Sequence, residues 1–184
     1  MNTPKVDLLK TSVLCAGLKA KLEAIDHPTL EGEKLFEVVA FHENKNLGEA
    51  LQDLVVVKKR VCFIVPQGDR FESKKEGRSQ VSDRFTSIDL LYADTAYTKG
   101  GNAAVFGGPN NVGVIAMNEI TLEVIAKDPQ LGGLRWCALQ PTEGAKIEMA
   151  AADAKAASGR EAWVQNYETP SGRIESPLHL AWTN

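Results

Sequence analysis

Three histidines, His27, His42 and His179, are the residues best suited to proton transfer near neutral pH. His27 precedes a proline, His42 lies beside Glu43 at the end of a β-rich segment, and His179 lies in an alternating segment near the C-terminus. None occurs in an HExxH, HxE or HxH pattern, the spacings that bind a metal or position a catalytic base. We interpret all three as surface or structural histidines.

Nucleophilic residues lack the sequence contexts that activate them. No GxSxG motif surrounds a serine. The cysteines, Cys15, Cys62 and Cys137, are odd in number and far apart, so neither a disulfide framework nor a CxxC metal half-site is expected. Their apolar neighbours favour small buried side chains in a reducing compartment. Burial of Cys62 in an apolar strand would raise the pKa of its thiol and make it a poor nucleophile.

A glycine-rich segment at Gly107–Gly113 precedes a helical pattern, as a phosphate-binding loop does. It lacks the Lys-Ser/Thr pair and the GxGxxG spacing, and Pro109 removes one amide donor. We interpret it as an ordinary loop or one ordered by assembly. Asp89 and Asp94 have no arrangement that would make them an acid–base couple and are read as solvated surface. The sequence therefore predicts no catalytic residue, cofactor site or metal site, and a protein that is not an enzyme.

Composition is that of one globular domain spanning residues 1–184. Hydrophobic residues make up 43% and charged residues 24% of the chain, enough apolar surface for a real core. The net charge of −3 gives no strong positive field to hold nucleic acid. No signal peptide and no apolar run of membrane-spanning length is present, so we expect a cytoplasmic site of synthesis and no membrane partner.

Hydrophobic periodicity predicts an α+β fold, with a mixed, mainly antiparallel sheet, about three helices packed on one face and a long charged β-hairpin loop. Proline and glycine signals place the element boundaries. The expected helices are Thr3–Ile25, Asn46–Val55 and Val114–Ile125; the expected strands are Leu35–Phe41, Val61–Val65, Phe85–Asp94, Leu134–Leu139, Trp163–Tyr167 and Leu178–Trp182, with a turn at Pro170–Gly172 and an alanine-rich helix or loop at Glu148–Ser158.

Two long polar segments, at about 66–83 and 97–113, are the unusual feature of the chain. Structureless loops above roughly 12–15 residues are uncommon in compact domains and are often functional. The first segment mixes both signs of charge. It is either a plain solvated loop or an arm that pairs with complementary charges on a neighbouring subunit. The candidate subunit-interface residues are Asp69, Arg70, Glu72, Lys74, Lys75 and Arg78.

This layout resembles the tail terminator (tail completion) proteins of long-tailed bacteriophages. The resemblance covers most of the chain and has no invariant catalytic motif. The segments 100–113 and 150–158 would be additions to the simplest members. The matching elements are the Leu8–Ile25 helix, the Val61–Pro66 strand, the charged hairpin, the Phe85–Tyr92 strand, the Val114–Ile125 helix and the Trp163–Tyr167 strand.

The resemblance implies a homo-oligomeric ring, a hexamer in this family, that caps the tail tube and joins tail to head. The implied partners are the tail tube protein, a head–tail connector protein and, in a contractile tail, the sheath protein. DNA would pass through the lumen without specific binding. The expected location is the tail or neck of a virion assembled in the host cytoplasm. Two alternatives stay open: another neck or tail component, such as a head-completion or tube protein, and a small cytoplasmic enzyme or ligand-binding domain.

Overall fold

One six-stranded sheet organises the molecule. The structure, a computed structural model, describes residues 4–42, 60–95, 103–108, 112–147 and 160–177. The strands follow the order β1-β6-β4-β3-β2, and β5 also pairs with β6. Their bounds are β1 Lys5–Leu8, β2 Val38–Phe41, β3 Arg60–Glu76, β4 Ser79–Thr95, β5 Gln140–Ile147 and β6 Arg160–Pro177, and the helices are α1 Thr11–Glu23, α3 Ala103–Phe106 and α4 Val114–Lys127.

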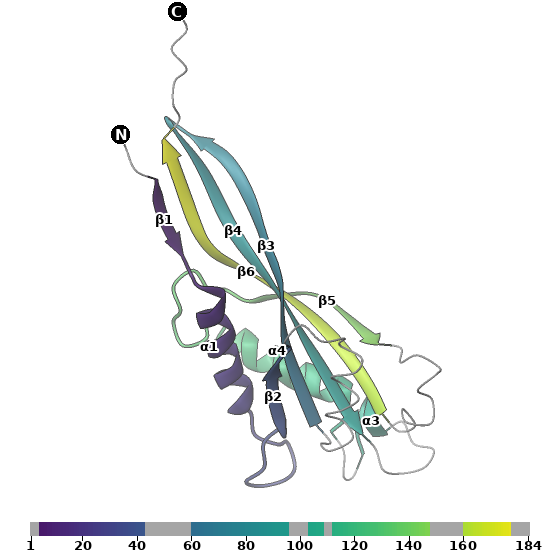
Figure 1. The fold of residues 1–184 in the computed structure, drawn as a ribbon. Helices are drawn as coiled ribbons and strands as arrows, with labels where there is room; N and C mark the ends of the chain where they lie inside the picture. Colours follow the sequence, from purple (N-terminus) through teal and green to yellow (C-terminus); the bar gives the residue numbers. More distant parts are fainter. Residues whose placement is uncertain (1–3, 43–59, 96–102, 109–111, 148–159, 178–184) are drawn as a thin grey trace, which may run out of the picture.

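Three long strands, β3, β4 and β6, run the whole length of the molecule (Figure 1). In one half, called the body, residues 60–65, 88–95 and 160–167 are flanked by parallel β2 and antiparallel β5. In the other half, called the arm, residues 68–76, 79–87 and 168–177 are joined by β1, which pairs with β6. The arm therefore continues the strands of the body past the end of its core.

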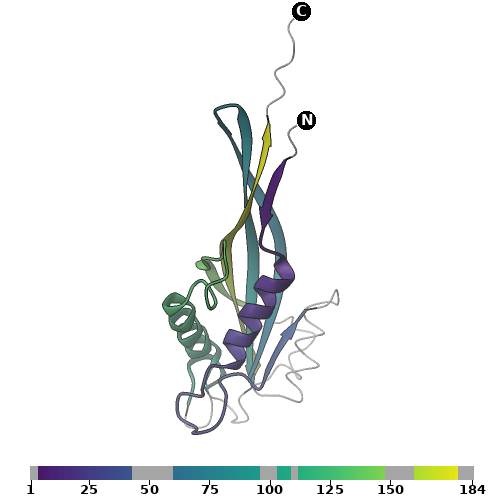
Figure 2. The same ribbon diagram turned by 90° about the vertical axis from the view of Figure 1, so that its left-hand side faces the viewer.

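The main core lies between the sheet and the two long helices, which cover the same face of the body (Figure 2). Leu14, Leu18 and Leu22 recur at helical spacing on α1 and are fully buried. Met117 and Ile125 do the same on α4, which confirms the helix expected at Val114–Ile125. Both sets pack against the sheet.

The opposite face of the body carries a second apolar cluster. Val61, Phe63 and Leu91 are its largest buried members, with Ala93 and Ala162 beside them. The body strands are thus buried on both faces. This explains why residues 61–65 form an uninterrupted apolar run, as expected for a central strand.

Several expected boundaries are wrong for identifiable reasons. The first helix begins at Thr11 and not at Thr3, because residues 5–8 pair with β6 as β1. The strand expected at Leu134–Leu139 is a series of turns, in which Trp136 has a positive φ of 68°, and β5 begins only at Gln140. The turn expected at Pro170–Gly172 is a bulge inside β6, where the register shifts opposite Arg84 and Phe85.

The segment expected as an extended loop at 66–83 is strand over nearly its whole length. Residues 68–76 pair with 79–87, and a tight turn at Gly77 and Arg78 joins them. Every residue from 66 to 78 is exposed, so neither face shows the apolar alternation from which a strand is recognised. Four expected elements lie wholly or mostly outside the described part of the chain: the helix at 46–55, the loop at 97–113, the segment 148–158 and the strand 178–182. The ranges concerned are 43–59, 96–102, 109–111, 148–159 and 178–184.

The predicted fold class, an α+β sheet with about three helices packed on one face, is wrong. Strands account for 52% of the structure, and the sheet curls into a half-barrel. Among the described residues, α1 and α4 are the two helices longer than a single turn. The polar strands of the arm supply the strand content that the apolar pattern did not indicate. No helix in the described ranges has the length and hydropathy to cross a membrane.

Gly172 allows β1 to approach β6. Its φ is +141°, and a Cβ atom there would lie 2.3 Å from the carbonyl oxygen of Asp7 and 2.7 Å from the Cα atom of Leu8. Gly68 has a similar φ of +138°, but a Cβ atom there would meet nothing within 4 Å. The two glycines therefore share a backbone conformation and differ in the space around them.

We expect Gly172→Ala to lower the free energy of unfolding by about 2–4 kcal/mol, because the strained φ and the collision with β1 act together. Gly68→Ala, with the strained φ alone, should cost about 1 kcal/mol. Urea denaturation of the two variants measures the difference. Equal losses would show that β1 is not held against β6 as described.

Candidate functional site

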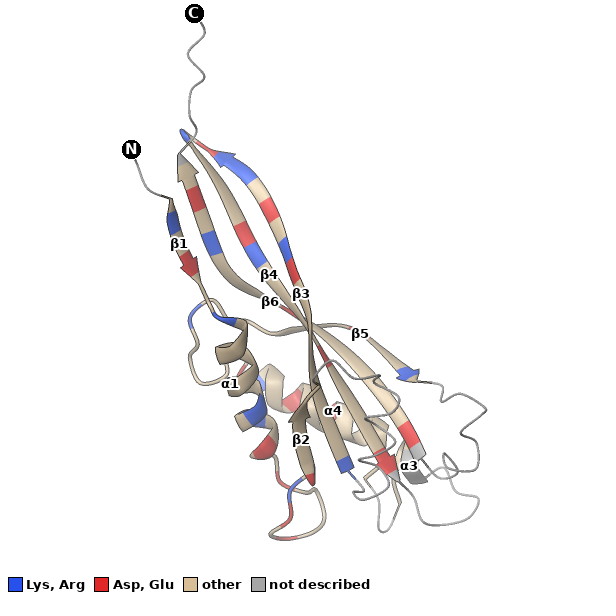
Figure 3. Ribbon diagram, viewed as in Figure 1, with Lys and Arg blue, Asp and Glu red and all other residues tan. Residues whose placement is uncertain are grey.

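The candidate interface residues lie on the arm, and the register of the strands sorts them onto two faces. Paired residues of neighbouring strands point to the same side of a sheet, and so do residues two apart along a strand. Residues of both charge signs recur along β3 and β6 in the arm (Figure 3). The register places most of them on one side of the sheet, called here the charged face, where positive and negative positions alternate. Its members are Arg70, Glu72, Lys74 and Glu76 of β3, Asp83 of β4, and Glu168 and Arg173 of β6.

Arg70 connects β3 to β6 across β4 on this face. Its Nε donates to Oε1 of Glu168 at 2.9 Å and its second guanidinium nitrogen donates to Oε2 at 2.7 Å. It also pairs with Glu72 and lies over the ring of Phe85, 4.3 Å from the centroid. The hydrogen bonds from Arg70 hold the pKa of Glu168 below its usual range. A forked, planar contact of this kind fixes the geometry of both side chains.

A second group of charges lies nearer the tip of the arm. Nε of Arg173 donates to Oδ1 of Asp83 at 2.7 Å, and Nζ of Lys74 lies 3.4 Å from Oδ2 of the same carboxylate. Lys74 also pairs with Glu76 at 2.9 Å. The hydrogen bond from Arg173 is the largest of the effects that lower the pKa of Asp83. These pairs are exposed, so each contributes little stability by itself.

Asp69 belongs to a different, partly buried network where the arm meets the body. Its carboxylate accepts hydrogen bonds from Arg84 at 2.6 Å and from Thr86 at 2.7 Å. Thr86 in turn contacts Ser171, and Arg84 donates to the carbonyl of Leu9 at 3.1 Å, just before α1. Burial raises the pKa of Asp69, but the hydrogen bonds from Arg84 and Thr86 outweigh it and the pKa is lowered. This network fixes the arm to the start of α1.

The face of the arm opposite the charged face carries exposed apolar side chains. Phe71 is 52% exposed and Val6 is 61% exposed, and Leu8 is also exposed. Lys75 lies on the same face as Phe71, four residues further along β3. Phe71 and Val6 lie on opposite edge strands of the arm, with β4 and β6 between them. These side chains are scattered and do not form one continuous patch within a single chain, so they become a shared apolar surface only where another molecule brings them together.

Both outer edges of the arm offer unpaired backbone. β2 pairs with residues 61–64 of β3, and within the described ranges nothing pairs with the outer side of β3 from residue 65 to its end. On the other side, β1 pairs with β6 and with no other strand that the structure describes. A row of unpaired amide and carbonyl groups is a ready template for a further strand.

The structure thus brings three of the six expected interface residues together on the charged face and separates the other three from them. Arg70, Glu72 and Lys74 form ion pairs on the charged face, and Asp69 holds the arm to the body. Lys75 lies on the opposite face, and Arg78 lies in the exposed turn. The missed partners are Asp83, Arg84, Glu168 and Arg173, together with the exposed Val6 and Phe71.

The histidines and cysteines that the structure describes lie in turns, at strand ends or in the core. Nδ1 of His27 accepts from the backbone amide of Leu30 at 3.0 Å in a turn, and burial is the first cause that lowers its pKa. Cys15, Cys62 and Cys137 are free and buried, and burial raises the pKa of each thiol. His42 directly follows β2, and His179 lies outside the described residues. No metal-binding cluster of His, Cys, Asp or Glu is present in the part of the chain that the structure describes.

Asp94 is buried and not the solvated surface residue that the sequence suggested. Its Oδ2 accepts from the amide of Gly113 at 2.9 Å, at the start of α4. A carboxylate at the N-terminus of a helix is favoured by the free amides and the helix dipole. Asp89, by contrast, contacts Gln67 and Asn166 at the boundary between body and arm. The two aspartates therefore serve separate structural contacts.

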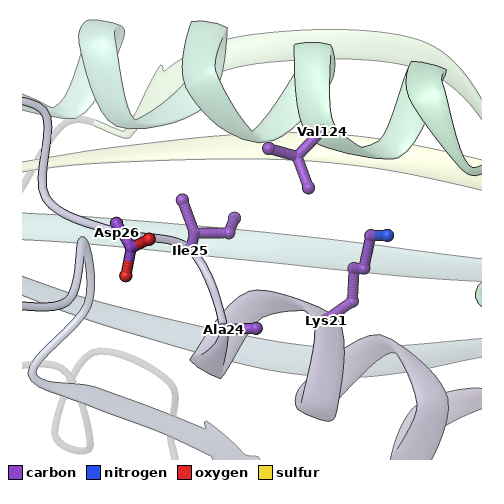
Figure 4. A pocket seen from close by; sticks show the side chains of 5 residues that line it. All are labelled: Lys21, Ala24, Ile25, Asp26 and Val124. Atoms are coloured by element: carbon purple, nitrogen blue, oxygen red, sulfur yellow. The ribbon is translucent and has the colours of Figure 1, made fainter.

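A pocket lies between the end of α1 and α4 (Figure 4). Lys21, Ala24, Ile25, Asp26 and Val124 line it. Nζ of Lys21 is already paired with Asp128 at 2.8 Å, and Asp26 is paired with Lys34. These charges are used to hold α1 to its neighbours, so the pocket does not converge on a reactive centre.

A comparison with models of protein families matched none, and a comparison with curated proteins found no similar sequence. The arm, with its charged face, its exposed apolar side chains and its two unpaired edges, is therefore the candidate functional site on the strength of its own geometry.

We expect Asp69→Asn to lower the free energy of unfolding at pH 7 by about 1–2 kcal/mol, because the charged hydrogen bonds to Arg84 and Thr86 are lost. The folded-state pKa of Asp69 is depressed, so its contribution is present above the unfolded pKa and is lost as pH falls through the folded value. The gap between wild type and variant should therefore be full above about pH 5 and should close below about pH 4. Urea denaturation across this range measures it.

Asp26→Asn is the matched control, because the Asp26 side chain is 82% exposed and forms a surface ion pair with Lys34. It should leave the free energy of unfolding nearly unchanged. A loss equal to that of Asp69→Asn, or a gap that does not close in acid, would contradict the described junction.

Proposed function

We propose that this chain is a structural subunit of a virion, resembling a phage tail terminator, that assembles into a hexameric ring, caps the tail tube and joins it to the head. The observation that supports the proposal is the arm, a part of the sheet that extends past the core and whose two outer edges pair with no other strand among the described residues. A strand edge of this length offers a row of backbone donors and acceptors to a neighbouring chain.

The composition of the arm favours subunit contact over a soluble appendage with no partner. Its charged face fixes side chains of both signs in defined positions by cross-strand ion pairs. Its other face exposes Phe71 and Val6 to solvent. Apolar contact supplies association energy, and fixed charges of both signs select register and partner.

The mechanism in this proposal is geometric. Heterologous contacts between identical subunits close into a ring when the rotation between neighbours closes. One side of the ring binds the end of the tail tube, the other binds the head–tail connector protein, and a sheath protein binds the ring in a contractile tail. Tube growth stops because the exposed side of the ring no longer resembles a tube end. The net charge of −3 suits a lumen through which DNA passes without being held.

The direct test is the native mass of the purified full chain and electron microscopy of its mixture with tail tubes. A closed ring that binds tube ends supports the proposal. Tubes formed by the chain alone would identify a tube subunit instead, and a monomer at high concentration that leaves tube ends uncapped would overturn the proposal.

We expect a shortened arm to fold but to lose ring formation or tube capping. The variant replaces residues 73–82 with Asn-Gly, so that the new two-residue turn joins Glu72 to Asp83. Hydrogen-bonded and non-hydrogen-bonded pairs alternate along the hairpin, and the Glu72–Asp83 pair is of the same kind as the Glu76–Ser79 pair that flanks the natural turn. Asp69 and Arg84 stay in place, so the junction is kept. Circular dichroism and native mass spectrometry measure fold and assembly.

The matched control places the same Asn-Gly dipeptide at the natural turn, in place of Gly77 and Arg78, and keeps the full arm. It should assemble as the wild type does. If the shortened variant also forms rings and caps tubes, the arm is not the assembly surface.

A further inference from the structure

Among the described residues, β3 and β1 are the edge strands on the two opposite sides of the arm, and their directions would allow them to pair with each other between two copies. β3 is antiparallel to β4, β4 to β6, and β6 to β1. A second copy placed beside the first, so that the sheet continues in the same sense, would bring its β1 next to β3 in an antiparallel orientation. Each copy would then use its β3 edge for one neighbour and its β1 edge for the other.

One register of this pairing matches the side chains of residues 5–7 of β1 and places Leu8 opposite Asp69. When Val6 of one copy lies opposite Phe71 of the other, two exposed apolar residues cover each other. In the same register Lys5 lies opposite Glu72 and Asp7 lies opposite Arg70. Both charge pairs lie on the charged face, because Lys5 and Asp7 pair through Glu175 and Arg173 with that side of the sheet. Opposite charges and apolar pairs directly across two strands are stabilising.

Neighbouring registers are unfavourable. A two-residue slip toward the tip of the arm places Lys5 opposite Lys74 and Asp7 opposite Glu72, so both pairs become like-charged. The two-residue slip in the other direction places Lys5 opposite Arg70. Like charges directly opposite each other destabilise a strand pair. A one-residue slip turns every side chain to the wrong face.

A four-residue slip restores opposite charges but places Val6 against Lys75. The exposed apolar residues then stay uncovered. Among the registers compared, the pairing of Val6 with Phe71 therefore satisfies both the charged face and the apolar face.

We propose that a second copy of this chain docks on the outer edge of β3 through its own β1, in antiparallel pairing with Val6 opposite Phe71. This inference rests on the proposed function as a ring subunit and specifies its subunit contact. The contact is heterologous, so it propagates from copy to copy until the ring closes.

A competing arrangement joins two copies through their β3 edges alone. Antiparallel pairing centred on Ser73 places Arg70 opposite Glu76 and Glu72 opposite Lys74, so the charges also match. It places Phe71 opposite Lys75, however, and leaves Val6 uncovered. It would also produce a closed dimer with no further contact.

Cysteine cross-linking separates these arrangements. Within one chain Val6 and Phe71 are separated by three strand spacings, about 14 Å, which is too far for a disulfide. In the proposed contact their Cβ atoms would lie about 4.5–5.5 Å apart. Mild oxidation of the full-length double variant Val6→Cys/Phe71→Cys should give a ladder of covalent oligomers on denaturing gels, and each single variant should give none.

The three natural cysteines are buried, so they contribute little background. Ser73→Cys serves as the control for the competing arrangement. Covalent dimers from Ser73→Cys, without a ladder from the double variant, would overturn the proposed register.

A charge exchange gives a second, independent readout. Lys5→Glu should weaken subunit association about 5–10-fold, because it replaces an attractive pair by a repulsive one. Glu72→Lys in the same chain should restore most of that loss. Lys5 also pairs with Glu175 in its own chain, and a defect confined to that pair would not be rescued at position 72. Absence of rescue would therefore overturn the proposed contact.

The outcomes distinguish this inference from the proposed function. Rings that cap tubes without the Val6–Phe71 ladder would overturn the contact and support the function. A ladder from a chain that never caps tubes would support the contact and overturn the function. A chain that stays monomeric would overturn both.

Discussion

Backbone hydrogen bonding along β4 is the constraint on which the rest of the structure depends. β4 is paired on both sides over almost its full length, with β3 along one edge and β6 along the other. In the body, this ladder is covered by apolar side chains on both faces. In the arm, the ladder continues without a second layer, and the exposed strands are held by their pairing to β4. The ion pairs of the arm require this central strand to stay paired on both sides, because they join residues of strands that it holds together.

The energy of the arm is distributed differently from that of the body. Burial of aliphatic side chains is the main stabilising contribution in the body. Surface ion pairs such as Lys74–Glu76 contribute little each, so the arm depends on its backbone ladder and on the partly buried contacts of Arg84 at the junction. Elements with few buried apolar contacts open more readily than the core. A partner that covers the edge and the exposed Phe71 would supply the stabilisation that the isolated arm lacks.

The sequence could predict the elements that pack on the core and could not predict the arm. Val61–Val65 and Val114–Ile125 were found because burial imposes an apolar pattern that is visible in the residues themselves. The arm strands have no buried face on β3, so their alternation is one of charge, which also fits a loop. Pro170–Gly172 has the residues of a turn, but because β6 stays paired with β4 on both sides of it, the segment forms a bulge and not a turn. Tertiary pairing decided these segments, and a single sequence does not display it.

The charged stretch proposed as the candidate site could be read from the sequence, but its partners could not. Asp69, Arg70, Glu72 and Lys74 were recognised as one charged stretch, although they divide between the junction and the charged face. Their partners are distant in sequence: Glu168 is 98 residues from Arg70, and Arg173 is 90 residues from Asp83. Only the strand register brings them together. Phe71 was a local signal, since it is a large apolar residue inside a charged run and is 52% exposed.

Charge on an edge strand has two physical consequences that act together in this arm. It opposes indiscriminate pairing, because most registers of a second strand bring like charges into contact. The same charges permit pairing with a strand that carries the opposite charge at each facing position. One charge pattern therefore both opposes aggregation and selects the partner strand. The position of the partner strand, β1, then matters as much as its sequence. β1 is held close to β6 by the absence of a side chain at Gly172, and the chain that follows it is held by Arg84, which also binds Asp69. The two edges of the arm are therefore fixed relative to each other by the junction, which makes the junction part of any contact that uses both edges.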